Sequence, residues 1–284
     1  NQDAELFKNK DIDAILIASV PSTHANYIEK ALTNHKPVFC EKPIDLSLNR
    51  IRQCYNRIKK NDLPIQIGFN RRFDPTHAKT KNLLKENKIG QLNQVIITSR
   101  DPEMPSEEYY KSAGGLFRDM TIHDFDLARF YLDEDPIEIF ASAQKLIDPN
   151  MMNKISDHDT AMFILTCKDG KQCFINNSRT AVYGYDQRVE LLGSNGMLQS
   201  GNQNLDQTKI YKRESSETSS PYLYFFIERY QEAFSLQLKS FIRSVKQNSS
   251  TDVGFEDGYK ALVIAEAAYK SLEERKSVSI NYDW

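Results

Sequence analysis

Three short apolar runs alternate with two amphipathic helical patterns over the first 70 residues of the chain. The first two, residues 14–18 and 38–40, are continuous and read as short strands buried in a sheet, and the third is marked by the alternate residues Ile65, Ile67 and Phe69. The order strand, helix, strand, helix, strand is typical of one mononucleotide-binding half of a doubly wound domain. The sequence therefore predicts a partial Rossmann-type parallel sheet in residues 1–69.

Polar residues follow each of the three runs, at 19–24, 41–43 and 70–73. In open α/β sheets, ligands bind beyond the carboxyl ends of the parallel strands, which all lie at one edge of the sheet. We expect these three segments to lie together and to line a ligand site.

One part of such a domain has no counterpart in this sequence. No G-x-G-x-x-G occurs, and no acidic residue can be assigned to the ribose that such a loop accompanies. A sheet that began with its second half would leave one flank of its central strand uncovered. We therefore expect an N-terminal segment of roughly fifty residues, about one βαβ unit, to precede this sequence in the parent protein.

Residues 70–284 show a different pattern, in which alternating apolar residues predict a large, mainly antiparallel open sheet with helices on one face. The residues Lys-Asp-Gly-Lys at 168–171 predict a hairpin turn, and the polar segment 213–220 is expected to be a mobile loop. The fold class is thus α/β followed by α+β, in domains 1–69 and 70–284. The expected strands are 92–99, 137–143, 160–167, 172–178, 189–192, 197–199 and 209–211, and the expected helices are 76–87, 114–129, 227–246 and 255–275.

Charge and cysteine content exclude several classes of partner. The 37 basic and 39 acidic residues give a net charge of −2, which argues against a nucleic-acid or an anionic-membrane partner. No apolar run approaches the length of a membrane span. The four cysteines lack metal-ligand spacing, so we expect no metal site and reduced, buried thiols in a cytoplasmic protein.

The segment 114–129, GGLFRDMTIHDFDLAR, carries the main catalytic signal. Its apolar residues recur at helical spacing, so Asp119 and His123 would lie one turn apart on one face of a helix. A carboxylate beside an imidazole can hold the ring in one tautomer and raise its basicity, which produces a general base near neutral pH. The alternative is a helix that exposes an acid and a histidine without any function.

Three motifs occur in register along the chain: CEKP at 40–43, GFNRRFD at 68–74, and GGLFRD followed by HD within 114–124. Together they resemble the glucose–fructose oxidoreductase/inositol dehydrogenase (Gfo/Idh/MocA) family, over nearly the whole chain. The segments TSRDP at 98–102 and YGYD at 183–186 resemble most the inositol 2-dehydrogenases of that family. The Gly-rich loop of the family is the element without a counterpart here.

The resemblance implies a dehydrogenase that moves a hydride from a secondary hydroxyl of a cyclic polyol, myo-inositol or a stereoisomer, to the nicotinamide of NAD. NADP remains open, because the residues that read the ribose would lie in the missing segment. A dehydrogenase of another sugar or of a nucleotide sugar has the same fold, and so does a non-catalytic regulator. A regulator does not need a base and a hydrogen-bond donor together, so the presence of Lys42, Asp119 and His123 favours an enzyme.

The resemblance also implies roles for residues at matching positions. Lys42, Asp119 and His123 would be catalytic, with Lys42 bonded to the reacting hydroxyl. The expected cofactor contacts are Ser19, Pro21, His24, Glu41, Lys42, Asn70 and Arg71. The expected substrate contacts are Lys42, Arg71, Arg100, Asp119, His123 and Tyr183.

Some of these residues have a structural alternative. His24 could instead pack at a helix N-terminus, and Tyr183 could fill a sheet face. Arg100 could pair with Asp101 on a surface loop.

The resemblance further implies a homodimer or homotetramer that forms through the open face of the C-terminal sheet. Phe163, Leu165, Phe174 and Ile175 could line that face or could cover the helices of their own sheet.

Overall fold

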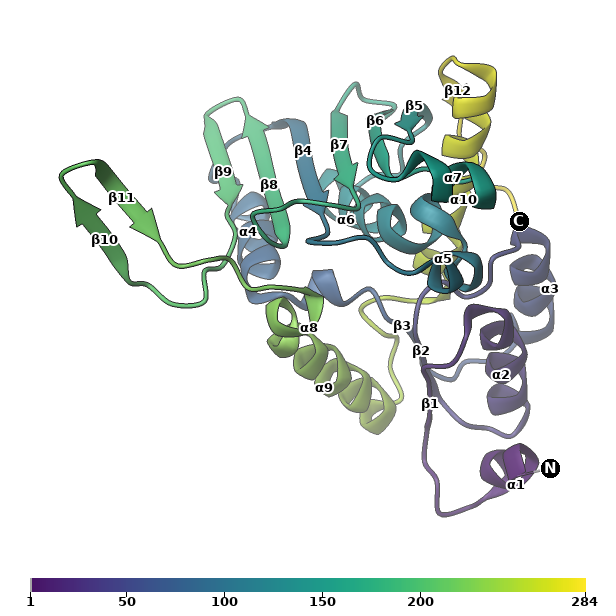
Figure 1. Cartoon of the computed structure of the whole chain (residues 1–284). Coiled ribbons are helices and arrows are strands. Elements are labelled where there is room, and N and C mark those ends of the chain that lie inside the picture. The colour runs from purple at the N-terminus through teal and green to yellow at the C-terminus, as the bar shows by residue number, and fades with distance from the viewer. Residues whose placement is uncertain (1) are drawn as a thin grey trace.

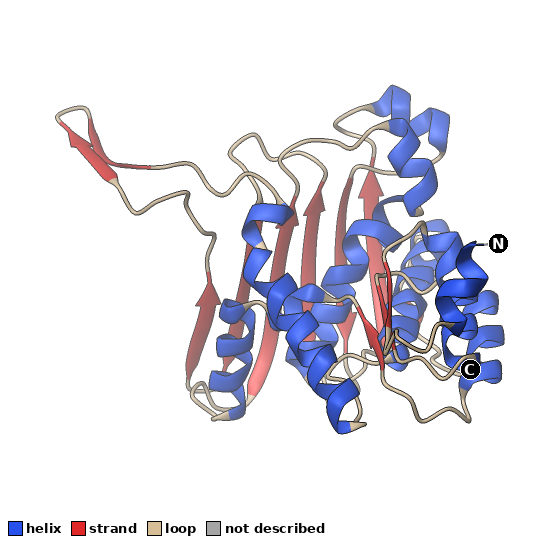
Figure 2. Cartoon of the chain, turned by 90° about the horizontal axis from the view of Figure 1, so that it is seen from below, coloured by secondary structure: helices blue, strands red, loops and turns tan. Residues whose placement is uncertain are grey.

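The structure is a computed structural model that describes residues 2–284. It contains a three-stranded sheet, a seven-stranded sheet and a two-stranded hairpin (Figure 1). The hairpin projects far from the rest of the chain, beyond one edge of the larger sheet (Figure 2).

The first sheet is formed by three parallel strands, which confirms the predicted partial Rossmann-type sheet. In order across the sheet they are β1 (Ile15–Ile17), β2 (Val38–Cys40) and β3 (Ile65–Ile67). Because Ile17 lies opposite Cys40, and Cys40 opposite Ile67, all three strands end at the same edge. The helices of this part are α1 (Gln2–Lys8), α2 (Pro21–Thr33) and α3 (Leu48–Ile58).

The second sheet is mixed but mainly antiparallel, as predicted. In order across the sheet its strands are β12 (Val278–Ser279), β5 (Glu138–Gln144), β6 (Thr160–Thr166), β7 (Gln172–Ser178), β4 (Leu92–Arg100), β8 (Asp186–Gly193) and β9 (Gly196–Ser200). The pair β4–β7 is parallel, and the other pairs formed by these strands are antiparallel. The predicted turn at 168–171 joins β6 to β7.

One face of the second sheet is covered by the helices α4 (Pro75–Lys85), α6 (Ile122–Leu132) and α10 (Phe255–Glu274) (Figures 1 and 2). The other face is open, which confirms the predicted arrangement. Since side chains alternate along a strand, Phe163, Leu165 and Ile175 are buried on the helix side. Of the four residues considered for the open face, only Phe174 lies on that side, opposite the exposed Ile164.

Some elements differ from the prediction. The segment 213–220 is not a mobile loop: it contributes β11 (Ser215–Ser219), which pairs with β10 (Lys209–Lys212) in the projecting hairpin. Its sequence has no apolar alternation; main-chain pairing and an ion pair between Lys209 and Glu217 at 2.7 Å join the two strands. The helix expected at 227–246 is divided into α8 (Phe226–Arg229) and α9 (Gln231–Gln247), and α5 (Glu107–Ala113), α7 (Pro149–Ile155) and β12 are too short to show a period in the sequence.

Helix α10 joins the two sheets into one packed unit. Gly258 lies against Ile44, and a Cβ at this glycine would be 2.6 Å from the Ile44 Cδ1 atom. The Ile67 N–H donates a hydrogen bond of 3.0 Å to the Val253 carbonyl, just before this helix begins. Absence of a side chain at position 258 therefore sets how closely α10 approaches the loop that follows β2.

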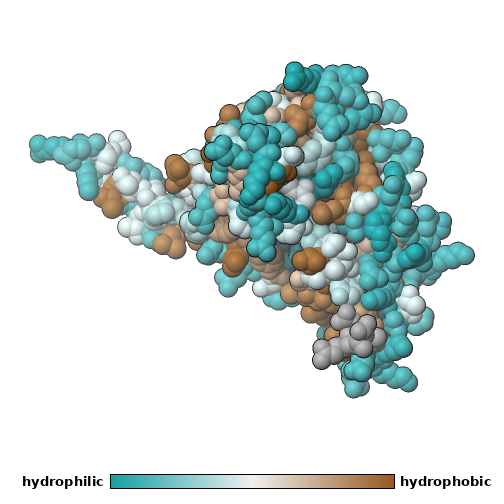
Figure 3. Space-filling view, turned by 45° about the vertical axis from the view of Figure 1, so that its right-hand side comes forward, coloured by the Kyte–Doolittle hydropathy of each residue, from teal (hydrophilic) through white to brown (hydrophobic). Residues whose placement is uncertain are grey.

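Hydrophilic residues cover most of the surface seen in Figure 3. Among the described residues, no helix is both long enough and apolar enough to cross a membrane. The four cysteines are buried and unpaired, as predicted.

Candidate active site

The carboxyl ends of β1, β2 and β3 bring the three predicted polar segments to one edge of the sheet. Main-chain hydrogen bonds of 2.9 and 2.8 Å continue the strand ladder as far as Glu41 and Gly68. The 3-10 helix η1 (Asn70–Phe73) then begins directly after β3. The predicted residues at this edge are Ser19, Pro21, Glu41, Lys42, Asn70 and Arg71.

Glu41 lies against Gly68, where the absence of a side chain makes room for its carboxylate. A Cβ at Gly68 would be 2.7 Å from the Glu41 Oε2 atom. Burial raises the pKa of Glu41, while the neighbouring Lys42 lowers it. The Glu41 carboxyl group is thus held between the carboxyl ends of β2 and β3.

His24 braces two loops at the same edge. Its Nδ1 atom lies 2.8 Å from the Pro43 carbonyl oxygen, and its Nε2 atom lies 2.8 Å from the Ser19 carbonyl oxygen. The side chain is buried. Both ring nitrogens are occupied, so the structure favours the packing alternative for His24 over a polar cofactor contact.

Lys42, in the loop after β2, and Asp119, in the segment Leu116–Thr121, meet at this edge. The Lys42 ammonium donates to the Asp119 Oδ1 atom at 2.9 Å and to the Asp119 main-chain oxygen at 2.8 Å. The hydroxyl of Tyr109, on α5, donates to the same Oδ1 atom at 3.1 Å. Burial alone would raise the pKa of Asp119, but the cations of Lys42 and Arg179 hold it far below its ordinary value. Asp119 is therefore a permanent carboxylate.

His123 does not pair with Asp119, contrary to the prediction. The segment Leu116–Thr121 forms a π-helix, η2, whose wider turns interrupt the four-residue repeat. The carboxylate oxygens of Asp119 are bound by other donors, and the His123 Nδ1 atom is buried without a partner among the described residues. Burial, with the charges of Lys42 and Arg71, holds the pKa of His123 well below its ordinary value. The Asp119 carboxylate raises the pKa of the ring through its charge, without a hydrogen bond, but this effect is smaller than the lowering. The ring is therefore neutral near pH 7 and can accept a proton.

Arg71 is buried and forms an ion pair with the Asp124 carboxylate. Its guanidinium donates to the carboxylate of Asp124 and, at 3.1 Å, to the Ser99 hydroxyl. The other Asp124 oxygen accepts from Asn177 at 2.8 Å. Burial would lower the pKa of Arg71, but the Asp124 carboxylate raises it above its ordinary value, so the guanidinium keeps its charge.

Arg100 and Tyr183 form a separate cluster. The Arg100 side chain lies on the other face of β4 from its neighbours Ser99 and Asp101, because successive residues alternate along a strand. Its guanidinium donates to the Tyr183 hydroxyl at 2.7 Å and to the Asn176 side chain at 3.0 Å. The structure does not bring these two predicted substrate contacts together with the other site residues. The alternative for Arg100 is also wrong, since Asp101 pairs with Arg179.

Two residues near the site were not predicted from the sequence. Arg179 follows β7 and donates to Asp119 at 2.8 Å. Tyr185, two residues beyond Tyr183, is buried against Tyr230, whose ring centroid lies 6.0 Å from the Arg71 guanidinium carbon. Strand alternation could have indicated that only one of the two tyrosines of YGYD faces inward, whereas no local pattern indicates Arg179.

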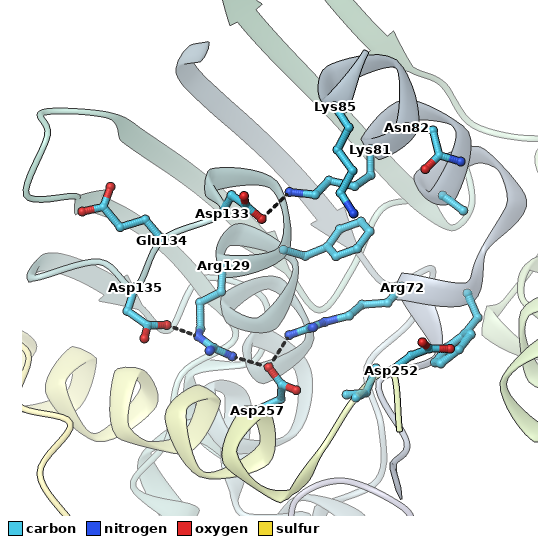
Figure 4. A pocket seen from close by; sticks show the side chains of 14 residues that line it. Arg72, Lys81, Asn82, Lys85, Arg129, Asp133, Glu134, Asp135, Asp252 and Asp257 are labelled. Atoms are coloured by element: carbon cyan, nitrogen blue, oxygen red, sulfur yellow. Dashed lines mark hydrogen bonds and ion pairs between the residues drawn. The ribbon is translucent and has the colours of Figure 1, made fainter. Parts of the chain in front are cut away.

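A cavity of about 590 Å³ lies elsewhere, between α4, the end of α6 and the start of α10 (Figure 4). Several of its charged residues pair with one another. Arg72 and Arg129 both contact the Asp257 Oδ1 atom at 2.9 Å, and Lys81 contacts Asp133 at 3.0 Å. None of the predicted site residues lines this cavity, so we do not place the active site there.

Glu134, Cys167 and Asp169 have potential metal-ligand atoms within 4.8 Å of one another. The Lys171 ammonium lies 3.4 Å from Glu134 and 3.1 Å from Asp169, so a protein cation already neutralises these carboxylates. Burial raises the pKa of Cys167 to about 12, which keeps the thiol protonated and a poor ligand. We assign no metal to this group.

Comparisons with known proteins show the family of the chain. Residues 1–69 match the oxidoreductase family with an NAD-binding Rossmann fold, and residues 77–199 match the GFO/IDH/MocA C-terminal domain. An inositol 2-dehydrogenase of Rhizobium meliloti is 42% identical over 270 residues, which cover 95% of this chain and 81% of that protein. A myo-inositol 2-dehydrogenase of Thermotoga maritima is also 42% identical, over 97% of this chain and 82% of that protein.

Solved structures show the same similarity. A myo-inositol dehydrogenase from Corynebacterium glutamicum superposes with a TM-score of 0.94 at 37% identity, over 98% of this chain and 83% of the other. A scyllo-inositol dehydrogenase from Lactobacillus casei, solved with NAD(H) and scyllo-inositol, gives 0.90 at 28% identity, over 99% and 84%. The chain therefore belongs to the Gfo/Idh/MocA family of NAD-binding oxidoreductases and is closely related to its inositol 2-dehydrogenases.

Proposed function

We propose that the chain oxidises a ring hydroxyl of myo-inositol or one of its stereoisomers with NAD. The observation that carries this proposal is that the Lys42 ammonium has one N–H donor without an acceptor in the described part of the chain. An ammonium has three N–H donors, and Asp119 accepts two of them. Residues 2–284 offer this nitrogen no further hydrogen-bond partner, so its third donor is free for the oxygen of a substrate hydroxyl.

The neighbouring histidine supplies the second group that the chemistry needs. Oxidation of a secondary alcohol removes a hydride from carbon and a proton from oxygen. His123 is neutral near pH 7 because of the lowered pKa described above, and although its Nδ1 atom is buried, the side chain as a whole is only partly buried. We assign to His123 the acceptance of the hydroxyl proton, and to Lys42 the stabilisation of the alkoxide that develops on the same oxygen.

The edge of the first sheet fits a dinucleotide. No side chain caps the N-terminus of α2. Pro21 has no N–H and the Thr23 N–H donates to the Val20 carbonyl at 3.0 Å, so the Ser22 main-chain N–H remains in the first turn for a phosphate. The hydroxyls of Ser19 and Thr23 lie 2.5 Å apart beside it. When bound, the nicotinamide would supply the hydride acceptor, and the residues that would hold the dinucleotide are Ser19, Pro21, Glu41 and Asn70.

A turnover screen tests the proposal. NADH formation is measured with myo-, scyllo- and chiro-inositol, with glucose and with a nucleotide sugar, each with NAD⁺ and with NADP⁺. We expect an inositol with NAD⁺ to give the highest kcat/KM. Binding of NAD⁺ in a calorimeter without turnover of any inositol would favour another sugar substrate or a regulator.

Single variants test the assigned roles. Lys42→Ala and His123→Ala should each remove most of the turnover, whereas Arg57→Ala, an exposed change on α3, should leave it unchanged. If either active-site variant retained turnover close to that of the wild type, the proposed chemistry would be wrong.

We further propose that two copies of the chain pair through the open face of the second sheet. Phe140, Ile164, Phe174 and Ile96 are neighbours in register across β5, β6, β7 and β4. Three of them are between 38% and 45% exposed, which forms an apolar row that a monomer would leave in water. Sedimentation should give at least a dimer, and Ile164→Lys should shift it toward the monomer; a monomeric wild type would contradict the proposal.

The boundary between the domains and the location of the chain belong to the same proposal. The chain would divide at residues 69 and 70, where β3 gives way to η1. Four unpaired, buried thiols are typical of a reducing compartment, which supports a cytoplasmic location.

A further inference from the structure

Arg179 binds the carboxylate that holds Lys42. It follows β7 directly and is buried, with 4% of its surface exposed. Its Nη2 atom donates to the Asp119 Oδ2 atom at 2.8 Å, and its Nη1 atom donates to the Asp101 Oδ2 atom at 2.9 Å. The guanidinium also lies over the ring of Tyr110, at 5.0 Å from the centroid. These contacts fix the side chain between two carboxylates.

Four charges therefore alternate in sign along one buried line. Lys42, Asp119, Arg179 and Asp101 are joined in that order at 2.9, 2.8 and 2.9 Å. Each side chain is at most 15% exposed, so each charge needs an opposite neighbour to offset its loss of hydration. The line ends at Lys42, on the side where the substrate hydroxyl would bind.

The two carboxylate oxygens of Asp119 have different partners. Arg179 binds Oδ2, whereas Lys42 and Tyr109 donate to Oδ1. The terminal torsion of an aspartate is broad, so an unrestrained carboxylate could turn its plane away from the ammonium. The bond from Arg179 to one oxygen fixes this plane and keeps the other oxygen directed at Lys42.

One N–H donor of Arg179 has no hydrogen-bond acceptor among the described residues. Its Nε atom is buried and has no hydrogen-bond partner among the described residues. An unpaired buried donor costs free energy. The side chain thus leaves one donor unpaired while both terminal nitrogens reach the two carboxylates.

We propose that Arg179 is a positioning residue of the active site, which fixes Asp119 so that Lys42 directs its remaining N–H at the reacting hydroxyl. The catalytic part of this role rests on the proposed function, whereas the restraint of Asp119 does not. The competing explanation is that Arg179 only neutralises buried charge and stabilises the fold.

Two substitutions and a matched control separate these explanations. Arg179→Met removes the guanidinium and keeps an apolar stem, and Arg179→Lys keeps a cation without the fork geometry. Arg129→Met is the control, because Arg129 is also largely buried and also joins two carboxylates, Asp135 at 2.6 Å and Asp257 at 2.9 Å (Figure 4). It contacts neither Lys42 nor Asp119.

The first readout is an NMR titration of the Asp119 side-chain carbon in the protein without ligands. In the wild type this carbon should show no titration down to about pH 3, because both cations hold the pKa far below its ordinary value, whereas in Arg179→Met the midpoint should rise by about one pH unit or more, because one of the two cations is lost. Arg129→Met should leave the midpoint unchanged, and Arg179→Lys should lie between. The charged and titratable groups that face Asp119 are Lys42 after β2, Asp101 after β4, Tyr109 on α5, His123 on α6 and Arg179 after β7.

The second readout is steady-state kinetics with myo-inositol. Arg179→Met should lower kcat by about ten- to a hundredfold, because Asp119 loses its charge-assisted hydrogen bond from Arg179 and holds the Lys42 ammonium less firmly. The KM for NAD⁺ should change by less than about twofold. Arg129→Met should lower the melting temperature and leave kcat within about twofold of the wild type. Partial recovery of kcat in Arg179→Lys is expected.

Several results would overturn the proposal. An unchanged Asp119 midpoint in Arg179→Met would show that Arg179 does not restrain the carboxylate, and equal losses of kcat in Arg179→Met and Arg129→Met would show a structural role only. If Arg179→Met does not fold, the midpoint in Arg179→Lys decides in its place. A wild-type chain that oxidises no inositol would contradict the proposed function, while the titration would still decide whether Arg179 holds Asp119.

Discussion

Lys42 and Asp119 are 77 residues apart in the sequence, yet their side chains are joined at 2.9 Å and the same ammonium also contacts the Asp119 main-chain oxygen at 2.8 Å. One contact fixes the ammonium to a side chain and the other fixes it to the backbone of η2. A lysine usually moves freely on its flexible stem. Here two acceptors hold the nitrogen in place, so the third donor is preorganised before a substrate arrives.

Replacing Lys42 with Met should remove that donor and keep the volume of the stem. We expect kcat for an inositol to fall by about 10²- to 10³-fold, the range observed when one donor to a developing oxyanion is lost. The KM for NAD⁺ should change little, because the ammonium is bonded to Asp119. Stopped-flow measurement of NADH formation would separate this loss from slow product release; a variant with full activity would mean that Lys42 is only a partner of Asp119.

Asp119→Asn should destabilise the fold in a pH-dependent manner. The pKa of Asp119 is lowered on folding, so its contribution to stability is present above the unfolded value of about 3.9 and is lost as the pH falls below it. Breaking a buried ion pair costs about 3–5 kcal/mol. Urea unfolding at pH 7 should show a loss of that order, and the difference from the wild type should shrink below about pH 4. A difference that is constant with pH would contradict the lowered pKa.

Some parts of this structure follow directly from local patterns. The short apolar runs predicted the positions of the parallel strands, but β1 is not buried on both faces, since Leu16 is exposed. Strand β7 was predicted with its observed bounds, Gln172–Ser178. The motifs around Lys42, Asn70 and Asp119 indicated one site, because strand ends of a parallel sheet lie at one edge.

Other parts could not be predicted in this way. The Asp119–His123 pair failed because the period of a regular helix was applied to a segment that is a π-helix. The pairing of Arg179 with Asp119 joins two elements 60 residues apart, and the sequence contains no periodicity that links them. Arg100 lies apart from the other predicted site residues because β4 extends one residue further than the predicted strand end and directs the Arg100 side chain to the other face of the sheet.

His77 should make the fold less stable in mild acid. Burial lowers its pKa to about 4, and its Nδ1 atom lies 2.9 Å from the Tyr131 hydroxyl. The unfolded chain, with a histidine pKa of about 6.5, binds more protons between these values, so stability is full above about pH 6.5 and falls by on the order of 3 kcal/mol toward pH 4. His77→Gln cannot ionise, and its stability should change less with pH over this window.

The control for this comparison is His35→Asn. His35 is exposed and has φ of 56°, a conformation that asparagine tolerates. Its pH dependence of stability, measured by thermal unfolding between pH 7 and pH 4, should match that of the wild type. If the stability of His77→Gln fell with pH as steeply as that of the wild type, other groups would cause the acid sensitivity.

Gly258→Ala tests whether the packing of α10 positions the loop that carries Lys42. An added Cβ would be 2.6 Å from the Ile44 Cδ1 atom, and Ile44 belongs to that loop. Overpacking a core costs about 1–3 kcal/mol, and the gain in helix propensity from Gly to Ala returns about 1 kcal/mol. We expect a net loss of stability in urea unfolding together with a fall in kcat, because Ile44 must move. Gly201→Ala, whose Cβ would meet nothing within 4 Å, should change neither quantity. A Gly258→Ala protein that is more stable than the wild type and fully active would mean that the loop yields without disturbing Lys42.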